Sequence, residues 1–259
     1  MSGPFGSDEE CNQSPPYVDV DLYTSDLPLQ RAVAANGGSE DSAALAAFGR
    51  RWGAADMFDL GRQANENPPK LRAFDPNGFR LDKVEFHPAY HHFMAESMAA
   101  GLHASTWSSD AGPVPAPAPA QVVRAARFYM AAQVETGHLC PITMTRAAVA
   151  ALAVEPAVAG KVMPKILSRV YDAHFLPWWE KTAITLGMGM TERQGGTDVR
   201  TNTTRAEPAG EGCIITGQKW FMSAPMCDAF LVLAQAPGGL TCFLLPRFRP
   251  DGSVNALRF

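Results

Sequence analysis

The sequence predicts an α+β protein in which an all-helical part, residues 22–183, precedes a β part, residues 184–259. Three observations predict this order. Ala-rich segments with apolar residues at helical spacing fill the first part, and short apolar runs divided by Gly, Pro and Asp fill the second. Helices and strands do not alternate as they do in folds with a parallel sheet. A hydrophobic content of 46% over 259 residues allows a substantial core.

Residues 1–21 are predicted to form a disordered tail. The stretch "MSGPFGSDEECNQSPP" is acidic and rich in Pro and Ser, and it lacks the basic start and apolar segment of a signal peptide. No apolar run approaches the roughly 18 residues of a membrane-spanning helix. The five cysteines have no CxxC spacing, which favours a reducing compartment. We therefore expect a soluble, cytoplasmic protein.

The helical part begins with an amphipathic helix predicted over Ser39–Gly61. The Pro- and Gly-rich residues 66–90 predict a loop before a second helix over Tyr90–Leu102. "GPVPAPAPA", residues 112–120, is typical of a stiff polyproline-like connection. Apolar periodicity predicts further helices over residues 121–137, 143–152 and 157–170.

The β part is predicted to be an antiparallel sheet. The compact apolar run Leu186–Met190 is typical of a buried strand, and the runs at residues 228–235 and 240–248 predict a hairpin that turns at Pro237–Gly239. A further hairpin is expected to start at Asp251–Gly252. An apolar strand at the end of such a sheet would leave an unpaired edge, so we expect a middle β-domain truncated at residue 259.

Charge and residue spacing exclude several kinds of site. With 22 Lys and Arg against 26 Asp and Glu, and no dense basic run, the sequence predicts no nucleic-acid site in this portion. His87, His91 and His92 lack matching carboxylate or thiolate ligands, and Pro88 interrupts their spacing, so we predict no metal site. The pair His138 and Cys140 comes without an oxyanion signature. No catalytic residue is therefore assigned.

The stretch "GMGMTERQGGTDVR", residues 187–200, has two interpretations. Gly195 and Gly196 can adopt positive φ and turn consecutive N–H groups toward one point, making an anion-binding nest with hydroxyls from Thr191 and Thr197. Alternatively, it is an ordinary β-turn whose Thr197 and Asp198 satisfy the backbone. It lacks the third glycine of the dinucleotide-binding fingerprint.

A resemblance to a known family favours the ligand-binding interpretation over the ordinary turn. "MTERQGGTD", residues 190–198, is similar to the signature of the acyl-CoA dehydrogenase family, and "GQKWFMSAP", residues 217–225, resembles its second flavin stretch. "GRQANENPPKL", "FHPAYHHFM" and "ETGHLCPITMT" resemble the AidB-like branch, which is linked to the adaptive response to DNA alkylation. The likeness extends over about residues 22–259.

The resemblance implies a fold and a cofactor. Its architecture is a helical N-terminal domain, a middle β-barrel and a C-terminal four-helix bundle, with FAD between barrel and bundle. Residues 22–183 would be the first domain and residues 184–259 a partial antiparallel β-barrel, with the four-helix domain absent from this portion. The family's catalytic glutamate lies in that bundle, so whether residues 1–259 act as an enzyme stays open.

The resemblance also implies the cofactor contacts. Met190 and Thr191 would lie against the flavin ring, Thr197 near the FAD diphosphate, and Phe221 where most relatives have a tryptophan on the ring. The full predicted set is Met188, Gly189, Met190, Thr191, Gly196, Thr197, Phe221, Met222 and Ser223. Glu192 is structural in the family, and Thr201 replaces a smaller residue of the signature.

The implied activity is that of an FAD-dependent oxidoreductase acting on CH–CH bonds of acyl thioesters such as acyl-CoA. The alternative is a noncatalytic flavin-binding or interaction protein in protection against DNA alkylation. The complete form is expected to be a homo-oligomer.

Overall fold

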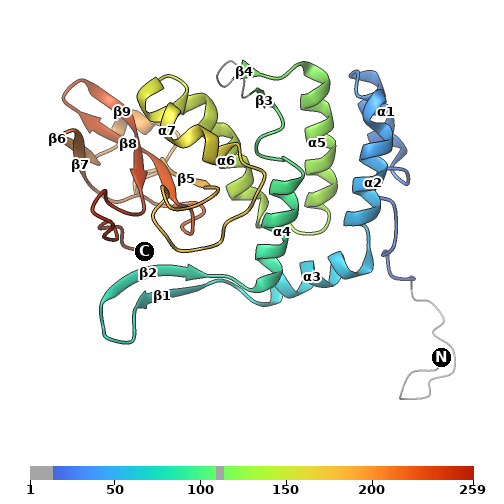
Figure 1. Ribbon diagram of the computed structural model, residues 1–259, viewed down its shortest axis with the longest axis horizontal. Helices are drawn as coiled ribbons and strands as arrows, with labels where there is room; N and C mark the ends of the chain where they lie inside the picture. Colours follow the sequence, from blue (N-terminus) through green and yellow to red (C-terminus); the bar gives the residue numbers. More distant parts are fainter. Residues whose placement is uncertain (1–13, 109–113) are drawn as a thin grey trace.

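The computed structural model describes residues 14–108 and 114–259, and it places a helical part beside a smaller sheet (Figure 1). The α-helices are α1 (Leu27–Ala35), α2 (Ser42–Trp52), α3 (Ala55–Glu66), α4 (Pro88–Ala99), α5 (Ala118–Ala132), α6 (Leu139–Leu152) and α7 (Pro156–Ile166). The strands are β1 (Lys70–Phe74), β2 (Arg80–Glu85), β3 (Trp107–Ser108), β4 (Val114–Pro115), β5 (Leu186–Gly189), β6 (Arg205–Ala209), β7 (Gly212–Thr216), β8 (Ala229–Ala236) and β9 (Gly239–Pro246). The five-stranded sheet follows the helical part as predicted, but the expectation of an all-helical part is wrong, because β1 to β4 lie between its helices.

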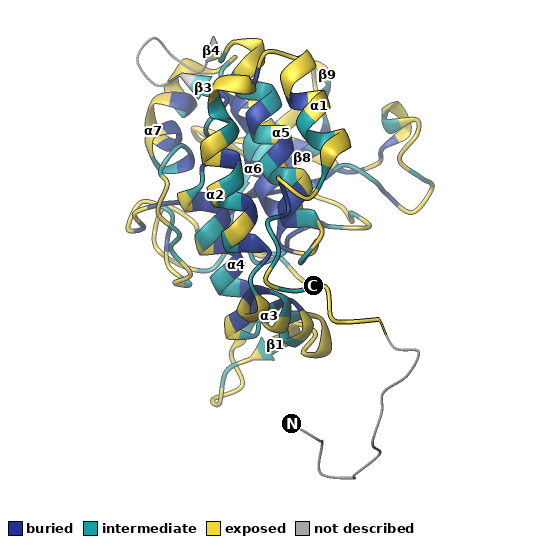
Figure 2. Ribbon diagram, turned by 90° about the vertical axis from the view of Figure 1, so that its right-hand side faces the viewer, coloured by how far each residue is buried: buried dark blue, intermediate teal, exposed yellow. Residues whose placement is uncertain are grey.

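The helical part is held by one apolar cluster. Leu45, Trp52, Phe93 and Met130, from α2, α4 and α5, are all buried in it. Figure 2 shows how these helices turn buried faces inward and exposed faces outward. The apolar periodicity of each segment places these residues on one helix face, and their burial is the main favourable term in its packing.

The prediction of a single helix over residues 39–61 is wrong, because the chain forms two helices there, α2 and α3, with a break at Gly53. The Gly53 carbonyl accepts the Val20 N–H at 3.1 Å, and a Cβ at Gly53 would collide with the Val20 carbonyl. The Asp19 carboxylate accepts the Ala55 N–H at 2.9 Å. The last residues of the predicted tail therefore bind the body, whereas residues 1–13 lie outside the described part.

Two segments predicted to lack regular structure contain it. Within the loop expected over residues 66–90, β1 and β2 form an antiparallel hairpin. The residues of β1 are mostly exposed, so no apolar alternation marks it in the sequence. Helix α5 begins at Ala118, inside the predicted polyproline connection, of which residues 112 and 113 are not described. Pro119 lies in its first turn, where a missing N–H costs no hydrogen bond.

The sheet is mixed, so the antiparallel prediction is wrong for β5. Strand β8 pairs in parallel with β5. It also pairs in parallel with β6, at one residue pair, and it pairs antiparallel with β9. Strands β6 and β7 form a hairpin, and among the described residues the five strands do not close into a barrel. The predicted β8–β9 turn is confirmed, with Ala236 opposite Gly239. The hairpin expected after Asp251 is a single bridge between Phe248 and Val254.

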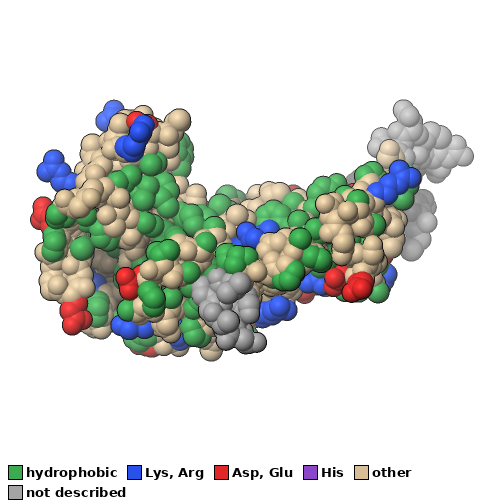
Figure 3. Space-filling model, turned by 90° about the horizontal axis from the view of Figure 1, so that it is seen from above, with side chains coloured by type: hydrophobic (Ala, Val, Ile, Leu, Met, Phe, Trp, Pro, Cys, Tyr) green, Lys and Arg blue, Asp and Glu red, His purple; other side chains and the backbone are tan. Residues whose placement is uncertain are grey.

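Helix α6 joins the two parts. The Thr145 hydroxyl accepts the Leu186 N–H at 3.0 Å, and Ala148 and Val149 pack with Leu186 and Leu231 in a second cluster. This contact fixes the start of β5 relative to the helical part. Seen from above, the surface is hollowed beside the taller lobe at the left of Figure 3, where apolar side chains gather. No helix in the described ranges has the length and apolarity needed to cross a bilayer.

Candidate functional site

The two segments predicted to contact the cofactor lie side by side. The Ser223 N–H donates to the Met188 carbonyl at 3.3 Å, and the two residues form an antiparallel bridge. The Trp220 N–H donates to the Thr191 carbonyl at 2.9 Å. Backbone bonds thus bring residues 188–191, at the end of β5, against residues 220–223, in the loop before β8.

Glycines permit this close approach. A Cβ on Gly187 would lie 2.7 Å from the Ser223 carbonyl oxygen, and one on Gly189 would lie 2.4 Å from the Met222 sulfur. Both distances are too short for a real side chain, so the glycines let the second segment approach the β5 backbone. Met188 and Met222 each pack against the apolar cluster that contains Phe230 and Val232.

The two aromatic side chains of the 220–223 loop are exposed to solvent and not buried in the core. Phe221 has a φ of 55° and is 80% exposed, and Trp220 beside it is 42% exposed. A left-handed conformation costs a non-glycine residue about 1–3 kcal/mol, so the surrounding structure must enforce it. The Ser223 hydroxyl donates to the Phe221 carbonyl at 3.2 Å and supports this geometry.

The turn after Thr191 agrees with both interpretations in part. The Gly195 N–H donates to the Glu192 carbonyl at 2.9 Å, as in an ordinary turn, and Asp198 caps the short helix Val199–Thr201. Gly195 has the expected positive φ, at 125°, but the expectation is wrong for Gly196. Glycine is needed at position 196 for a different reason: an added Cβ would lie 2.5 Å from the Thr191 hydroxyl oxygen. Thr197 follows, exposed in a bend.

Glu192 ties this turn to the rest of the site. Its buried carboxylate accepts from the Lys219 ammonium at 2.8 Å and from the N–H groups of Thr203 and Thr204 at 2.6 and 3.0 Å. Burial raises its pKa, but these hydrogen bonds outweigh burial and hold the pKa of the Glu192 carboxyl well below its usual range. The carboxylate is therefore a fixed anion that joins three segments, and it has no proton to exchange near neutral pH.

Three of the histidines make hydrogen bonds within the fold. His138 is buried and bonds Glu135 at 2.6 Å and Ser97 at 2.8 Å, so it does not form a pair with the exposed Cys140. His87 caps α4 through the Ala89 N–H. His91 bonds the Tyr171 hydroxyl at 2.8 Å, and burial lowers the pKa of His91.

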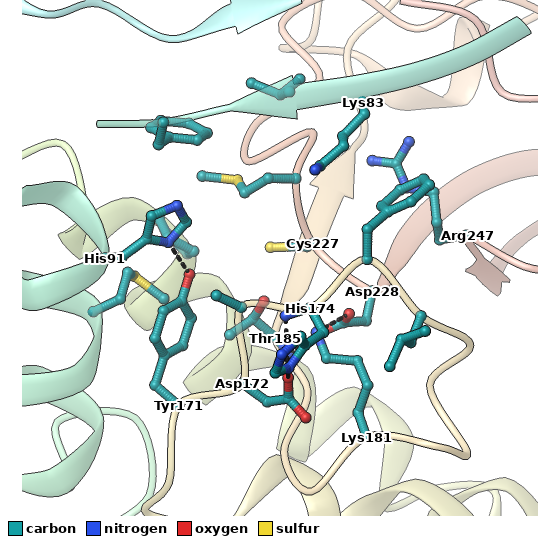
Figure 4. A pocket seen from close by; sticks show the side chains of 18 of the residues that line it. Lys83, His91, Tyr171, Asp172, His174, Lys181, Thr185, Cys227, Asp228 and Arg247 are labelled. Carbon is teal, nitrogen blue, oxygen red and sulfur yellow. Dashed lines mark hydrogen bonds and ion pairs between the residues drawn. The ribbon is translucent and has the colours of Figure 1, made fainter. Parts of the chain in front are cut away.

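A cavity of about 340 Å³ lies apart from the predicted flavin contacts, and no sequence motif marks it (Figure 4). Lys83 of β2 and Arg247 line one side of it, and Lys181 and Asp228 line the other. The Lys181 ammonium donates to the Asp228 carboxylate at 2.5 Å. Cys227 faces the space, and burial raises its pKa to about 12, so the thiol is not a nucleophile near neutral pH.

Two family models match the chain. The model described as the adaptive response protein AidB N-terminal domain matches residues 12–173, and that of the acyl-CoA dehydrogenase middle domain matches residues 187–258. The chain belongs to the acyl-CoA dehydrogenase family. It represents the AidB-like branch of that family, as the segments at residues 61–71, 86–94 and 135–145 predicted.

Curated relatives of this AidB-like chain are longer than it. The AidB protein of Escherichia coli (strain K12) is 48% identical over 249 residues, which cover 95% of this chain and 45% of the relative. Acyl-CoA dehydrogenase family member 11 of Caenorhabditis elegans is 25% identical over 256 residues, covering 94% of this chain and 40% of the relative. The chain thus spans less than half the length of either.

Solved structures share the fold. The apo-form of Bd2924 superposes with a TM-score of 0.78 at 26% identity, over 94% of this chain and 49% of that one. The Caenorhabditis elegans protein ACDH-11, solved in complex with C11-CoA, gives a TM-score of 0.76 at 24% identity, over 95% of this chain and 43% of that one.

Proposed function

We propose that this AidB-like chain forms the flavin-edge portion of an FAD-dependent oxidoreductase that acts on CH–CH bonds of acyl thioesters. The observation that carries the proposal is the pairing of residues 188–191 with residues 220–223 through the Ser223–Met188 and Trp220–Thr191 backbone bonds. Both segments match the family's flavin motifs, and the fold makes one continuous edge from them.

The residues present fit a flat aromatic ring. Phe221 holds an exposed ring on a strained backbone, which supports a role in binding because no packing within the described residues accounts for its display. Gly189 lets the Met222 side chain lie against the β5 backbone, and Met190 lies half-buried beside it. An aromatic ligand stacked on such a surface is stabilised by about 0.5–1.5 kcal/mol beyond the area it buries.

Each side chain has a role in this proposal. Bound FAD would accept hydride, and the protein would supply binding, orientation and a dry surface. The Thr191 hydroxyl would bond the pyrimidine edge of the flavin, with Ser223 as a second hydroxyl. Phe221, with Met188, Met190 and Met222, would exclude water from the ring. Gly196 and Thr197 would lie toward the diphosphate.

The rest of the activity is proposed from the family. The base that removes the substrate proton would come from a four-helix domain, and the relatives extend well beyond the length matched here. Acyl thioester as the substrate follows the family, and the relative ACDH-11 was solved with C11-CoA. We also propose that the open sheet is part of the family's β-barrel and that the complete protein is a cytoplasmic homo-oligomer.

Titration of FAD into the complete gene product, followed by flavin fluorescence, tests the flavin site. We expect saturable binding at one FAD per chain, weakened by Thr191→Val and unaffected by Thr216→Val on exposed β7. Absence of saturable binding would overturn the proposal. Tight FAD binding without dehydrogenation of any acyl-CoA would instead favour the noncatalytic, alkylation-protective alternative.

A further inference from the structure

The cavity contains a buried cation, Arg247, for which the described part of the chain supplies no anionic partner. Arg247 is 2% exposed, and among the described residues no carboxylate oxygen lies within ion-pair distance of its guanidinium. Its Nη1 donates to the backbone carbonyl of Asp82 at 3.2 Å, and its Nε–H has no hydrogen-bond partner. The Asp82 carboxylate instead binds Arg80, at 2.5 Å.

Lys181, a second buried cation in the same cavity, does have an anionic partner. Lys181 is 5% exposed, and Asp228 lies 2.5 Å from its ammonium. A buried charge without a counter-ion is strongly unfavourable, and buried charges are usually paired with an opposite charge. Within the described residues, Lys181 has such a partner and Arg247 does not.

Aromatic rings offset only part of the charge on Arg247. Its guanidinium carbon lies 4.9 Å from the ring centre of Phe259, 5.3 Å from that of Phe230 and 5.8 Å from that of Phe175. A cation–π contact is worth less than a buried ion pair and satisfies no N–H in the guanidinium plane. Burial lowers the pKa of Arg247 to about 10, so the group stays charged at neutral pH.

Part of the remaining wall is apolar, beside polar groups such as Asp172 and His174. Phe86, Met94 and Phe248 line the cavity, whose volume of about 340 Å³ lies in the range of small-molecule sites. Tyr90 stacks on Phe86 with ring centres 4.0 Å apart, and its buried hydroxyl has no partner among the described residues. The cavity includes none of the predicted flavin contacts, such as Thr191 and Phe221.

We propose that this cavity binds a small organic carboxylate, with the carboxylate group on the free side of the Arg247 guanidinium and the apolar body against Phe86, Met94 and Phe248. A carboxylate matches the planar donor fork of arginine and supplies the missing counter-ion. The site is separate from the flavin edge and would accept its ligand without FAD chemistry.

Isothermal titration of the complete gene product with hexanoate, and with the uncharged hexanamide as the isosteric probe, tests the proposal. We expect hexanoate to bind at one per chain and hexanamide to bind at least tenfold more weakly. Arg247→Gln should lower hexanoate affinity at least tenfold. Equal affinity for the two probes, or no binding of either, would overturn the proposal.

A second variant keeps the test decisive if Arg247→Gln does not fold. Ala173 is exposed on the loop that lines the cavity, so Ala173→Trp should obstruct it without entering the core. Ala151→Trp on the exposed face of α6 is the matched control. Hexanoate binding should fall at least tenfold in the first and stay unchanged in the second, and unchanged binding in both would contradict the proposal. Flavin absorbance of the same samples reports the FAD site independently.

Discussion

The Ser223 N–H lies 3.3 Å from the Met188 carbonyl oxygen and joins the two segments that are proposed to contact the flavin. The segments are separate in sequence, and each alone is a short turn or strand. Together they make one edge, with Phe221 on its surface and Gly187 and Gly189 beneath it.

Gly187→Ala should destabilise this edge. The added Cβ would lie 2.7 Å from both the Ser223 carbonyl oxygen and the Phe230 ring, and a backbone atom moves less readily than a flexible side chain. We expect a loss of about 1–3 kcal/mol in the free energy of unfolding, measured in urea. Gly212→Ala on β7, where the added Cβ meets no atom, is the control. Equal stability of the two variants would show that the close approach is not needed.

Thr191→Val should weaken FAD binding by about 1–3 kcal/mol, because a buried polar group of the flavin would lose its hydrogen-bond partner. Valine keeps the shape of threonine, so the unfolding free energy should change little. Fluorescence titration in the complete gene product measures the loss. An unchanged dissociation constant would remove Thr191 from the proposed site.

Gly196→Val should impair both folding and FAD retention. Its φ is not positive, so the cause is contact rather than backbone strain: the added Cβ would lie 2.5 Å from the Thr191 hydroxyl oxygen. We expect the displaced Thr191 to lower the flavin content of the purified protein, with Gly212→Val as the control. Full flavin content in Gly196→Val would argue against this contact.

Glu192→Gln should be the most destabilising of these changes. It leaves the Lys219 ammonium, with its side chain 9% exposed, without its anionic partner, and breaking a buried pair in this way costs about 3–5 kcal/mol. Glu207→Gln on exposed β6 is the control. Urea unfolding at neutral pH measures both, and similar losses would contradict the role of Glu192 as the tie between segments.

The Glu192 carboxylate should make the free energy of unfolding depend on pH in the acidic range. Its folded-state pKa lies below the ordinary value of 4.5, so its contribution is fully present above that value and is lost as the pH falls through the folded-state pKa. Below about pH 4.5 the wild-type unfolding free energy should fall more steeply than that of Glu192→Gln. Parallel pH profiles would show that Glu192 is not linked to folding.

Local patterns predicted the helices α4 to α7 and the β8–β9 hairpin, because apolar periodicity and the turn at residues 237–239 are properties of short segments, whereas α1 was not predicted. Contacts between distant segments were beyond that reasoning. The break at Gly53 depends on the Val20 backbone, and the parallel pairing of β5 with β8 depends on where α6 holds Leu186.

The flavin contacts were predicted from family motifs, whereas the cavity had no motif. Its walls come from β2, α4 and the segments around Tyr171, Cys227 and Arg247. Whether Arg247 has an anionic partner within residues 14–108 and 114–259 depends on which carboxylates the fold places near it. Sequence spacing reports nothing about that arrangement.

The most direct test of the account is a crystal structure of the complete gene product with FAD. We expect the flavin ring on the edge formed by residues 188–191 and 220–223, with the Thr191 hydroxyl hydrogen-bonded to its pyrimidine edge and Phe221 against the ring. A flavin bound elsewhere, with Thr191 and Phe221 free of it, would contradict the account.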